Sequence, residues 1–464
     1  MATVITGADG LFTGGRDPVR TAGSLRFADG VITHVGDAVA EPGDCVIDAS
    51  GCVIYPGFVN THHHLAQSML KGIPAALNLP VTDWLTAVPY RYWRHLDAET
   101  FRLAAIIGMS EMLLSGTTTI ADHHYIYSPD LGYDPSEILF EVAAELGVRF
   151  VLCRGSATRP SRLSSAGAVG VPAEPVAATL RAMDGLAQRY HDAGPRAMRK
   201  VVLAPTNLIW SVEPQDKLAR GARALGLRLH SHLSEAPGDV EHCVATRGLR
   251  PVAYAEANEF VGEDVWFAHL VHVDEAELSI LAQTGTAMAH CPQSNARLGS
   301  GIAPAPRLDA LGGTVTIGVD GAASNEAADM ISELHSAWHL HRAQGDAGAV
   351  TVEDVVRWSS ANGAKVLGFD DVGTLAPGMA ADLSIFDLSH PRYMGLHDPL
   401  IGPVAAAGSA ALKAVFVNGH QVVRDGAIPG LDLVSMARSA RRLVERLDGL
   451  VEGHRPAQEL AGAL

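Results

Sequence analysis

Short apolar runs alternate with amphipathic stretches through the middle of the chain. Eight of the runs have the length expected of β-strands, and stretches with helical spacing, such as residues 98–116 and 136–147, separate most of them. This alternation is typical of an α/β fold, and eight βα units favour a (β/α)8 barrel of the TIM type over an open doubly wound sheet. The predicted strands span residues 53–64, 117–124, 149–156, 200–206, 228–235, 265–271, 287–292 and 315–321.

Glycine-rich phosphate-binding patterns are missing from the turns after these runs. Neither GxGxxG nor a P-loop sequence follows any predicted strand. Such loops bring backbone N–H groups close to phosphate groups. We therefore expect no nucleotide cofactor.

Short β-like pieces separated by Gly and Asp occupy both flanks of the chain. Residues 1–55 and 372–427 share this pattern, and neither flank could enclose a core alone. We expect them to join into a small composite β-sandwich, with bounds at 1–55 and 366–430, beside a barrel of residues 56–365. Helical apolar spacing near the C-terminus predicts that residues 431–464 form a helical segment packed on the body.

The composition argues against membrane, secreted and nucleic-acid-binding classes of protein. Of 464 residues, 47% are hydrophobic and 19% charged, and no segment approaches the roughly 18 apolar residues that a membrane span requires. The N-terminus lacks the basic start and apolar run of a secretory signal, and the five cysteines include no CxxC pair. The net charge of −16 opposes binding to nucleic acid. We expect a cytoplasmic protein with reduced thiols that binds neither nucleic acid nor membrane.

Polar residues gather at the carboxyl ends of the predicted strands. The strings HHH, DHH, RGS, HSHLSE, AHL, AHCP and VDG each close one run. In TIM barrels the active site lies on this face. The same end of successive strands is therefore the expected catalytic face.

A histidine pair closes the first predicted strand. His62 and His64 stand two residues apart, so their imidazoles can share one side of the strand and one ion, while His63 points away. His232 and Asp320 close two further strands. Three imidazoles and one carboxylate, with a position left for water, are typical of a catalytic zinc site, although iron(II) accepts the same ligands.

Two alternatives to a mononuclear metal site fit these residues less well. An isolated histidine pair is commonly a pair of satisfied core side chains, but four such residues at three strand ends argue against a purely structural role. A binuclear site usually needs a bridging ligand, often a modified lysine on the fourth strand, and Lys200 lies at the wrong end of that strand. We expect one divalent metal ion.

Three residues are candidates for catalysis. A metal lowers the pKa of its bound water toward neutrality, and Asp320 can accept the proton of that water. His269, at the end of the sixth predicted strand, can hydrogen-bond the water or the tetrahedral intermediate. Glu235, three residues after His232, can carry a proton to a ring nitrogen and then to departing ammonia. Five other histidines stay open between pocket and structural roles: His123, His124, His230, His272 and His290.

The strand-end motifs PGFVNTHHHL, HSHLSE, FAHLV and IGVDGAASNEAADM resemble those of the amidohydrolase superfamily, in its branch of cytosine, guanine and triazine aminohydrolases. The flanks resemble that family's split β-sandwich, so the similarity covers essentially the whole chain. Within the branch, the chain is most similar to isoxanthopterin deaminases, then to 8-oxoguanine deaminases and hydroxyatrazine-type aminohydrolases. The resemblance implies hydrolytic loss of an exocyclic amine as ammonia from a pterin or oxopurine. It assigns metal binding to His62, His64, His232 and Asp320, proton transfer to Glu235, and contact with the water or intermediate to His269.

Three further residues are candidates for substrate binding. Gln67 resembles a position that bonds the ring edge in purine deaminases, and its amide both donates and accepts hydrogen bonds. Arg154 offers a fork of donors for ring oxygens, and Trp84 can stack on or wall a flat ring.

The resemblance leaves two alternative reactions. One is a purine deaminase of the 8-oxoguanine or guanine type, and the other is a triazine amino- or chlorohydrolase. The triazine enzyme can lack the acid at the position of Glu235, so its presence here favours deamination. The family commonly forms homo-oligomers, and we expect the same of this chain.

Overall fold

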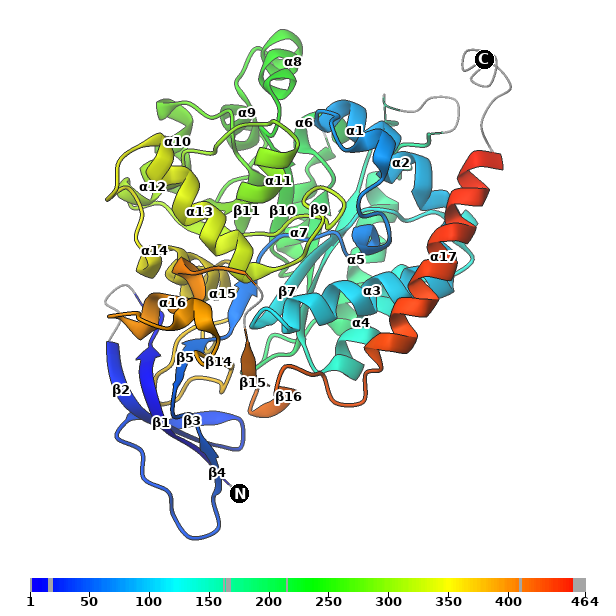
Figure 1. Ribbon diagram of the computed structural model, residues 1–464. Coiled ribbons are helices and arrows are strands. Elements are labelled where there is room, and N and C mark those ends of the chain that lie inside the picture. Colours follow the sequence, from blue (N-terminus) through cyan, green and yellow to red (C-terminus); the bar gives the residue numbers. More distant parts are fainter. Residues whose placement is uncertain are drawn as a thin grey trace.

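A barrel of parallel strands forms the centre of the structure, a computed structural model that describes residues 2–15, 20–161, 163, 168–213, 216–408 and 411–453 (Figure 1). Its strands are β6 (Phe58–Asn60), β7 (Thr117–His124), β8 (Arg149–Ser156), β9 (Arg199–Pro205), β10 (Leu229–Leu233), β11 (Val265–His269), β12 (Ala287–His290) and β13 (Val315–Ile317). They pair in chain order from β6 to β13. Backbone hydrogen bonds from Thr61 N to Ile317 O and from Asp320 N to His62 O, both 3.0 Å, join the first strand to the last and close the barrel.

Helices surround this barrel. With helices outside and side chains filling the interior, the strands are buried on both faces, which explains why they read as continuous apolar runs. Every residue of β7 and β8 is buried. The predicted (β/α)8 barrel is confirmed.

The helices between the barrel strands are α1 (Val81–Ala87), α2 (Pro89–Tyr92), α3 (Ala98–Leu113), α4 (Pro135–Leu146), α5 (Val176–Tyr190), α6 (Leu208–Ser211), α7 (Leu218–Ala224), α8 (Pro237–Arg247), α9 (Pro251–Ala257), α10 (Glu275–Thr284), α11 (Pro292–Arg297) and α12 (Ala305–Ala310). After β13 come α13 (Met330–Gln344), α14 (Val352–Arg357), α15 (Gly363–Val366), α16 (Gly402–Ala405) and α17 (Leu433–Gly453).

The first predicted strand, residues 53–64, is divided in the structure. Its beginning, β5 (Cys52–Pro56), pairs with strands of the terminal segments, and only β6 enters the barrel. Gly57 lies at the division, where a Cβ atom would stand 2.2 Å from Cγ2 of Thr118. Glycine therefore lets the chain pass from one sheet to the other against β7. Because the apolar pattern of this segment is unbroken, the sequence does not indicate the change of sheet.

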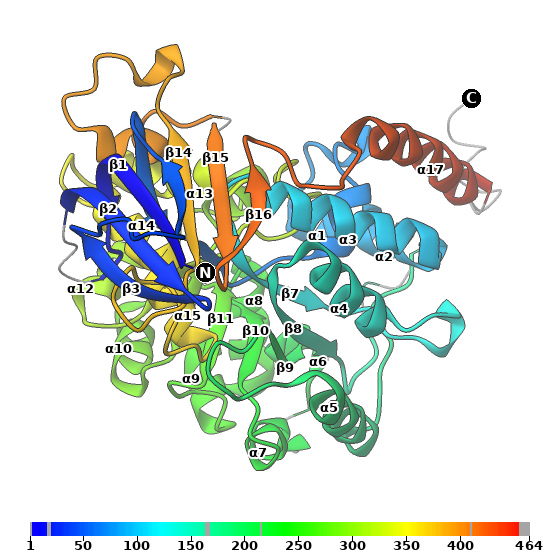
Figure 2. The ribbon, with the colours of Figure 1, turned by 90° about the horizontal axis from the view of Figure 1, so that it is seen from below.

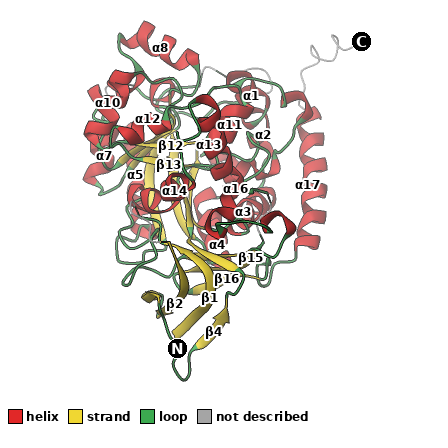
Figure 3. Ribbon diagram, turned by 60° about the vertical axis from the view of Figure 1, so that its left-hand side comes forward, coloured by secondary structure: helices red, strands yellow, loops and turns green. Residues whose placement is uncertain are grey.

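Both terminal segments contribute to a second, mixed sheet, as predicted. Its strands are β1 (Ala2–Phe12), β2 (Arg20–Ala28), β3 (Val31–Gly36), β4 (Cys45–Asp48), β5, β14 (Leu383–Asp387), β15 (Leu412–Val417) and β16 (His420–Arg424). Seen from below, β1 to β3 lie beside β14 to β16 (Figure 2), and Figure 3 shows the sheet projecting from one end of the molecule.

This terminal sheet curls around a core of its own. The order of pairing places β14, β5 and β1 between β15 and β2. Nevertheless the rings of Phe27 on β2 and Phe416 on β15 pack edge to face, with centroids 5.2 Å apart. Strands spaced about 4.8 Å apart in a flat sheet would keep these rings far apart, so the sheet folds back on itself. The expected sandwich is thus one continuous sheet with its inner face enclosed.

Helix α17 lies along the outside of the barrel against α2 and α3 (Figure 1). Leu443, Leu447 and Val451 are its buried residues, and Arg446 binds Asp97 at 2.6 Å. Residues 454–464 of the predicted helical segment lie outside the described residues. Within the described part of the chain, no helix is both long and apolar enough to cross a membrane. All five cysteines are free thiols.

A buried ion pair connects the barrel to the terminal sheet. The guanidinium of Arg149, the first residue of β8, binds both carboxylate oxygens of Asp382 at 3.0–3.2 Å, and both side chains are fully buried. Asp382 also accepts from Asn418 N at 2.7 Å. Because a buried charge without its partner is strongly unfavourable, each ion depends on the other.

We predict that Arg149→Met lowers the free energy of unfolding by about 3–5 kcal/mol, because it leaves the Asp382 carboxylate buried and unpaired. Urea denaturation measures this change. The matched control is Arg102→Met, which removes an exposed pair with Glu145 and should cost less than about 1 kcal/mol. Equal losses in the two variants would contradict this account of the connection.

Candidate metal centre and active-site pocket

The predicted metal ligands meet at the carboxyl ends of the barrel strands. Oδ1 of Asp320 lies 3.3 Å from Nε2 of His62 and 3.2 Å from Nε2 of His64. Nε2 of His64 lies 3.1 Å from Nε2 of His232. His269, at the end of β11, joins them: its ligand atom and those of His62, His232 and Asp320 all lie within 4.8 Å of one another. Five polar side chains from four strand ends thus share one small volume.

Backbone carbonyls fix the tautomers of two of these imidazoles. Nδ1 of His64 lies 2.7 Å from the His123 carbonyl oxygen, and Nδ1 of His232 lies 2.5 Å from that of Thr206. Because a carbonyl oxygen only accepts, each Nδ1 carries the proton and donates. Each Nε2 therefore presents a lone pair to the shared volume, as a metal-ligating histidine does.

The carboxylate of Asp320 is held in a similar way. Its Oδ2 atom accepts hydrogen bonds from Ser294 Oγ at 2.5 Å and Ser324 Oγ at 2.9 Å. Its Oδ1 atom faces the imidazoles. One oxygen is thereby fixed to the protein while the other is directed at the centre.

These atoms fit a divalent cation. The 3.1 Å contact between Nε2 of His64 and Nε2 of His232 joins two lone pairs, and Nε2 of His62 makes no hydrogen bond within the described residues. Burial lowers the pKa of His62 to about 3 and that of His232 well below its ordinary value, so both rings are neutral. Neutral imidazoles and a carboxylate are ligands that zinc and iron(II) accept.

Several residues around this centre have strained backbone conformations. His269, Leu270, Ser234 and Asp320 all have φ between 49° and 75°, the left-handed region that non-glycine residues avoid. Each such residue costs on the order of 1–3 kcal/mol and persists only where surrounding contacts hold it. The strain lies at the strand ends that direct side chains into the centre, which is typical of a functional site.

Glu235 lies beside the centre. Its Oε2 atom is 3.6 Å from Nε2 of His269, whose Nδ1 lies 2.9 Å from Oδ1 of Asn295. Burial raises the pKa of Glu235 to about 7. A carboxyl group with this pKa can both give and take a proton near neutral pH.

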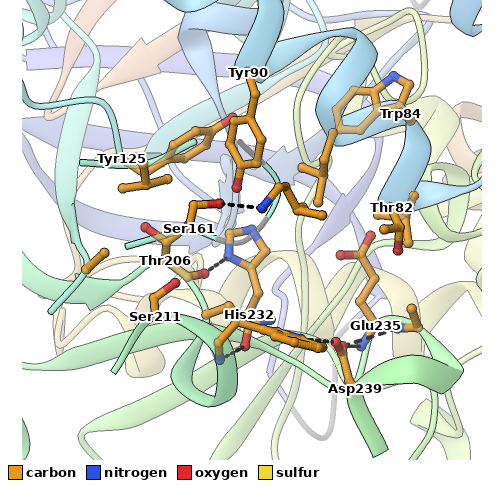
Figure 4. A pocket seen from close by; sticks show the side chains of 18 of the residues that line it. Thr82, Trp84, Tyr90, Tyr125, Ser161, Thr206, Ser211, His232, Glu235 and Asp239 are labelled. Carbon is orange, nitrogen blue, oxygen red and sulfur yellow. Dashed lines mark hydrogen bonds between the residues drawn. The ribbon is translucent and has the colours of Figure 1, made fainter. Parts of the chain in front are cut away.

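Asp239 fixes the turn that carries Glu235. Its Oδ2 atom accepts from Glu235 N at 2.9 Å and Ala236 N at 3.3 Å, while Oδ1 accepts from Trp210 Nε1 at 2.8 Å. Figure 4 shows Asp239 below Glu235, with the dashed hydrogen bonds between the drawn residues. Neither Asp239 nor Trp210 is among the residues predicted from the sequence, where an acidic residue in the first turn of α8 was the available signal.

A pocket opens above the centre. Trp84, Tyr90 and Tyr125 wall one side of it (Figure 4). Trp210 and Thr206 also line the pocket, together with four of the metal-centre residues: His64, His232, His269 and Asp320. Aromatic walls around a few polar groups suit a flat heterocycle.

Two of the three predicted substrate-binding residues line this pocket. Gln67 and Trp84 are both buried, and Oε1 of Gln67 has no hydrogen-bond partner among the described residues. Arg154 does not line the pocket, because its guanidinium binds Glu174 at 2.8 Å and stacks over the ring of Tyr127. Among the described residues of the lining the arginine is Arg159, whose Nε binds Glu213 at 3.1 Å. The prediction for Arg154 used only its position at a strand end, and that position gives no sign of the ion pair with Glu174.

The remaining histidines divide between the centre and the packing around it. His123 stacks on His232 with centroids 4.7 Å apart, and His230 lies 2.9 Å from His62. His124 faces the Ile126 carbonyl, His290 pairs with His341, and His272 is half-buried. His123 and His230 thus touch the metal-centre residues directly.

Comparisons with known proteins agree with this site. The model of the amidohydrolase family matches residues 53–422. The chain belongs to this family. It is therefore a hydrolase of the type that acts on carbon–nitrogen bonds, as the sequence predicted.

Individual relatives of this amidohydrolase carry deaminase and aminohydrolase names. An isoxanthopterin deaminase from an unknown prokaryotic organism is 47% identical, covering 96% of this chain and 97% of its own. The 8-oxoguanine deaminase of Pseudomonas aeruginosa is 37% identical over 92% of this chain and 95% of its own. The hydroxydechloroatrazine ethylaminohydrolase of Pseudomonas sp. (strain ADP) is 34% identical over 88% and 85%. This order confirms the resemblance inferred from the motifs.

A solved structure supports the same fold. The atrazine chlorohydrolase of Arthrobacter aurescens TC1, crystallised with zinc, superposes with a TM-score of 0.88 at 27% identity, covering 95% of this chain and all of that chain.

We predict that Asp239→Ala lowers the free energy of unfolding by about 1–3 kcal/mol, because Glu235 N, Ala236 N and Trp210 Nε1 lose their acceptor. Urea denaturation measures the change. Asp192→Ala is the control, since the carboxylate of this exposed residue accepts from Gly194 N at the surface, and it should change stability by less than about 0.5 kcal/mol. A native stability for Asp239→Ala would refute the role of this carboxylate in holding the turn.

Proposed function

We propose that this amidohydrolase is a metal-dependent deaminase that removes an exocyclic amino group, as ammonia, from a fused heterocycle, a pterin such as isoxanthopterin. The observation that carries the proposal is Glu235, a carboxyl group whose pKa is raised to about 7, at 3.6 Å from His269 beside the metal centre. The isoxanthopterin deaminase relative, at 47% identity, supports the pterin. The 8-oxoguanine deaminase, at 37%, makes a purine ring the second candidate. A triazine ring is the third.

We propose His62, His64, His232 and Asp320 as ligands of one divalent ion, with zinc first and iron(II) second. When bound, such an ion supplies a water molecule of lowered pKa as the nucleophile. The zinc in the related chlorohydrolase structure supports the choice of metal. The aligned Nε2 lone pairs and Oδ1 of Asp320 are the atoms that would bind it.

In the proposed reaction, water adds to the ring carbon that bears the amino group, and the carbon–nitrogen bond then breaks. Asp320 accepts a proton from the attacking water. Glu235 delivers its proton to the ring nitrogen, and the hydroxyl proton of the tetrahedral adduct then passes through Glu235 to the departing amine, so that ammonia leaves and a ring carbonyl remains. The proton held by Asp320 restores the protonated form of Glu235 for the next turnover. Because Nδ1 of His269 faces Oδ1 of Asn295, its Nε2 atom is the acceptor for a hydrogen bond from the water.

Gln67 and Trp84 are the proposed contacts with the ring. The free Oε1 atom of Gln67 can accept from a ring N–H, and the indole of Trp84 forms part of the aromatic wall. Arg154, engaged with Glu174, is not kept among the substrate contacts. Arg159 lines the pocket but is likewise paired, with Glu213 at 3.1 Å, and is not proposed as a substrate contact.

The decisive experiment is an ammonia-release assay on the metal-loaded protein with isoxanthopterin and other pterins, 8-oxoguanine, guanine, cytosine and triazines. We expect ammonia from isoxanthopterin with the highest kcat/KM. A chelator should abolish the activity, and addition of zinc or iron(II) should restore it. Preference for 8-oxoguanine would select the second candidate. Failure of every ring in the panel would refute deamination.

We predict that Glu235→Gln lowers kcat by a factor of about 10²–10⁴, because the amide cannot transfer the proton, while KM changes little. Steady-state kinetics on the preferred substrate measures both constants. Glu241→Gln, an exposed change on the helix α8 that follows Glu235, is the matched control and should leave both constants unchanged. A kcat within threefold of the native value would exclude Glu235 as the proton carrier.

A further inference from the structure

His230 links one proposed metal ligand to the barrel wall. Its Nε2 atom lies 2.9 Å from Nδ1 of His62, and its Nδ1 atom lies 2.9 Å from the Trp266 carbonyl oxygen. His62, His230 and Trp266 are all fully buried. Unlike His64 and His232, whose Nδ1 atoms face backbone carbonyls, His62 faces a second side chain.

This chain of contacts determines which nitrogen of His62 carries the proton. The Trp266 carbonyl can only accept, so Nδ1 of His230 donates to it and Nε2 of His230 is left as an acceptor. Nδ1 of His62 must then donate to Nε2 of His230. The Nε2 lone pair of His62 consequently faces Asp320 and the proposed metal.

Packing also fixes the orientation of the His230 ring. It stacks on the indole of Trp266, with centroids 4.7 Å apart and planes at 19°. Nε1 of that indole donates to the carbonyl oxygen of Thr61 at 3.1 Å, directly before His62 in the chain. The contacts form a closed circuit from Thr61 through His62, His230 and Trp266 back to Thr61. Rotation of either imidazole would break it.

We infer that His230 is a positioning residue of the metal centre: it accepts the Nδ1 proton of His62 and so keeps the Nε2 lone pair of His62 directed at the ion. The inference rests on the metal dependence within the proposed function but on no particular substrate. Loss of an outer hydrogen-bond partner of a metal-ligating histidine typically weakens metal binding about 10- to 100-fold.

A competing arrangement uses the same residues. Ligand atoms of His62, His123 and His230 lie within 4.8 Å of one another, and Nδ1 of His123 has no hydrogen-bond partner among the described residues. A second ion held there would require His62 to bridge two metals through both ring nitrogens. The hydrogen-bonded circuit satisfies His62 and His230 without a second ion, so we favour one metal per chain.

The test compares His230→Phe, which removes the acceptor and the donor, with His230→Gln, whose amide supplies both. The dissociation constant for Zn²⁺ is measured on metal-free protein by competition with a chromophoric chelator, together with metal stoichiometry and the visible spectrum of the Co²⁺ form. His290→Phe is the control, because it replaces a buried histidine at the end of β12 that pairs with His341 and is not part of this circuit. Circular dichroism checks the fold, and His230→Asn, whose amide is too short to reach both partners, replaces His230→Phe if that variant fails to fold.

We expect His230→Phe to raise the Zn²⁺ dissociation constant at least tenfold and to change the Co²⁺ spectrum. His230→Gln should lie closer to the native protein than to His230→Phe, and His290→Phe should stay within threefold of native. Native affinity in folded His230→Phe, or equal losses in the His230→Phe and His230→Gln variants or in His290→Phe, would overturn the inference. Two ions per native chain, reduced to one in His230→Phe, would make His230 a ligand instead. Because the readout is metal binding, an unexpected substrate leaves this result unaffected.

Discussion

Several lone pairs point at one buried volume at the carboxyl end of the barrel, an arrangement that suits a cation. Nε2 of His64 lies 3.1 Å from Nε2 of His232, and Oδ1 of Asp320 lies 3.2 Å from the former. Hydrogen bonds on the far side of each ring prevent the imidazoles from turning away. Without a positive charge these acceptors repel one another, so the surrounding structure holds them at a cost in stability.

The barrel tolerates this loss of stability because hydrogen bonds join its strands into a closed ring. Closure between β6 and β13 brings His62 against Asp320, although 258 positions separate them in the chain. The left-handed backbone at His269, Ser234 and Asp320 is a further strain that only a packed scaffold sustains. The scaffold thus holds its polar groups in place before any ligand arrives, which is how a barrel enzyme stabilises charge.

Different parts of the molecule form the metal centre and the walls of the pocket above it. The centre, with Glu235 beside it, depends on strand ends and on the turn that Asp239 holds. The pocket walls come from the loops and short helices above, including Trp84 on α1 and Trp210 on α6. Relatives named for pterin, purine and triazine substrates are 47%, 37% and 34% identical to this chain, and different substrates on one fold are typical of functions that depend on the site rather than on the scaffold.

The barrel, its strand positions and the residues that meet at its centre could be predicted from the sequence, because apolar periodicity and the spacing of His62 and His64 are local signals that the backbone translates directly. Features that depend on contacts between distant segments could not. The change of sheet at Gly57 follows from the approach of Thr118, and Arg154 is diverted from the pocket by Glu174. The partner of His62 is likewise a matter of packing, since only the closed barrel places His230 against it, 168 residues away.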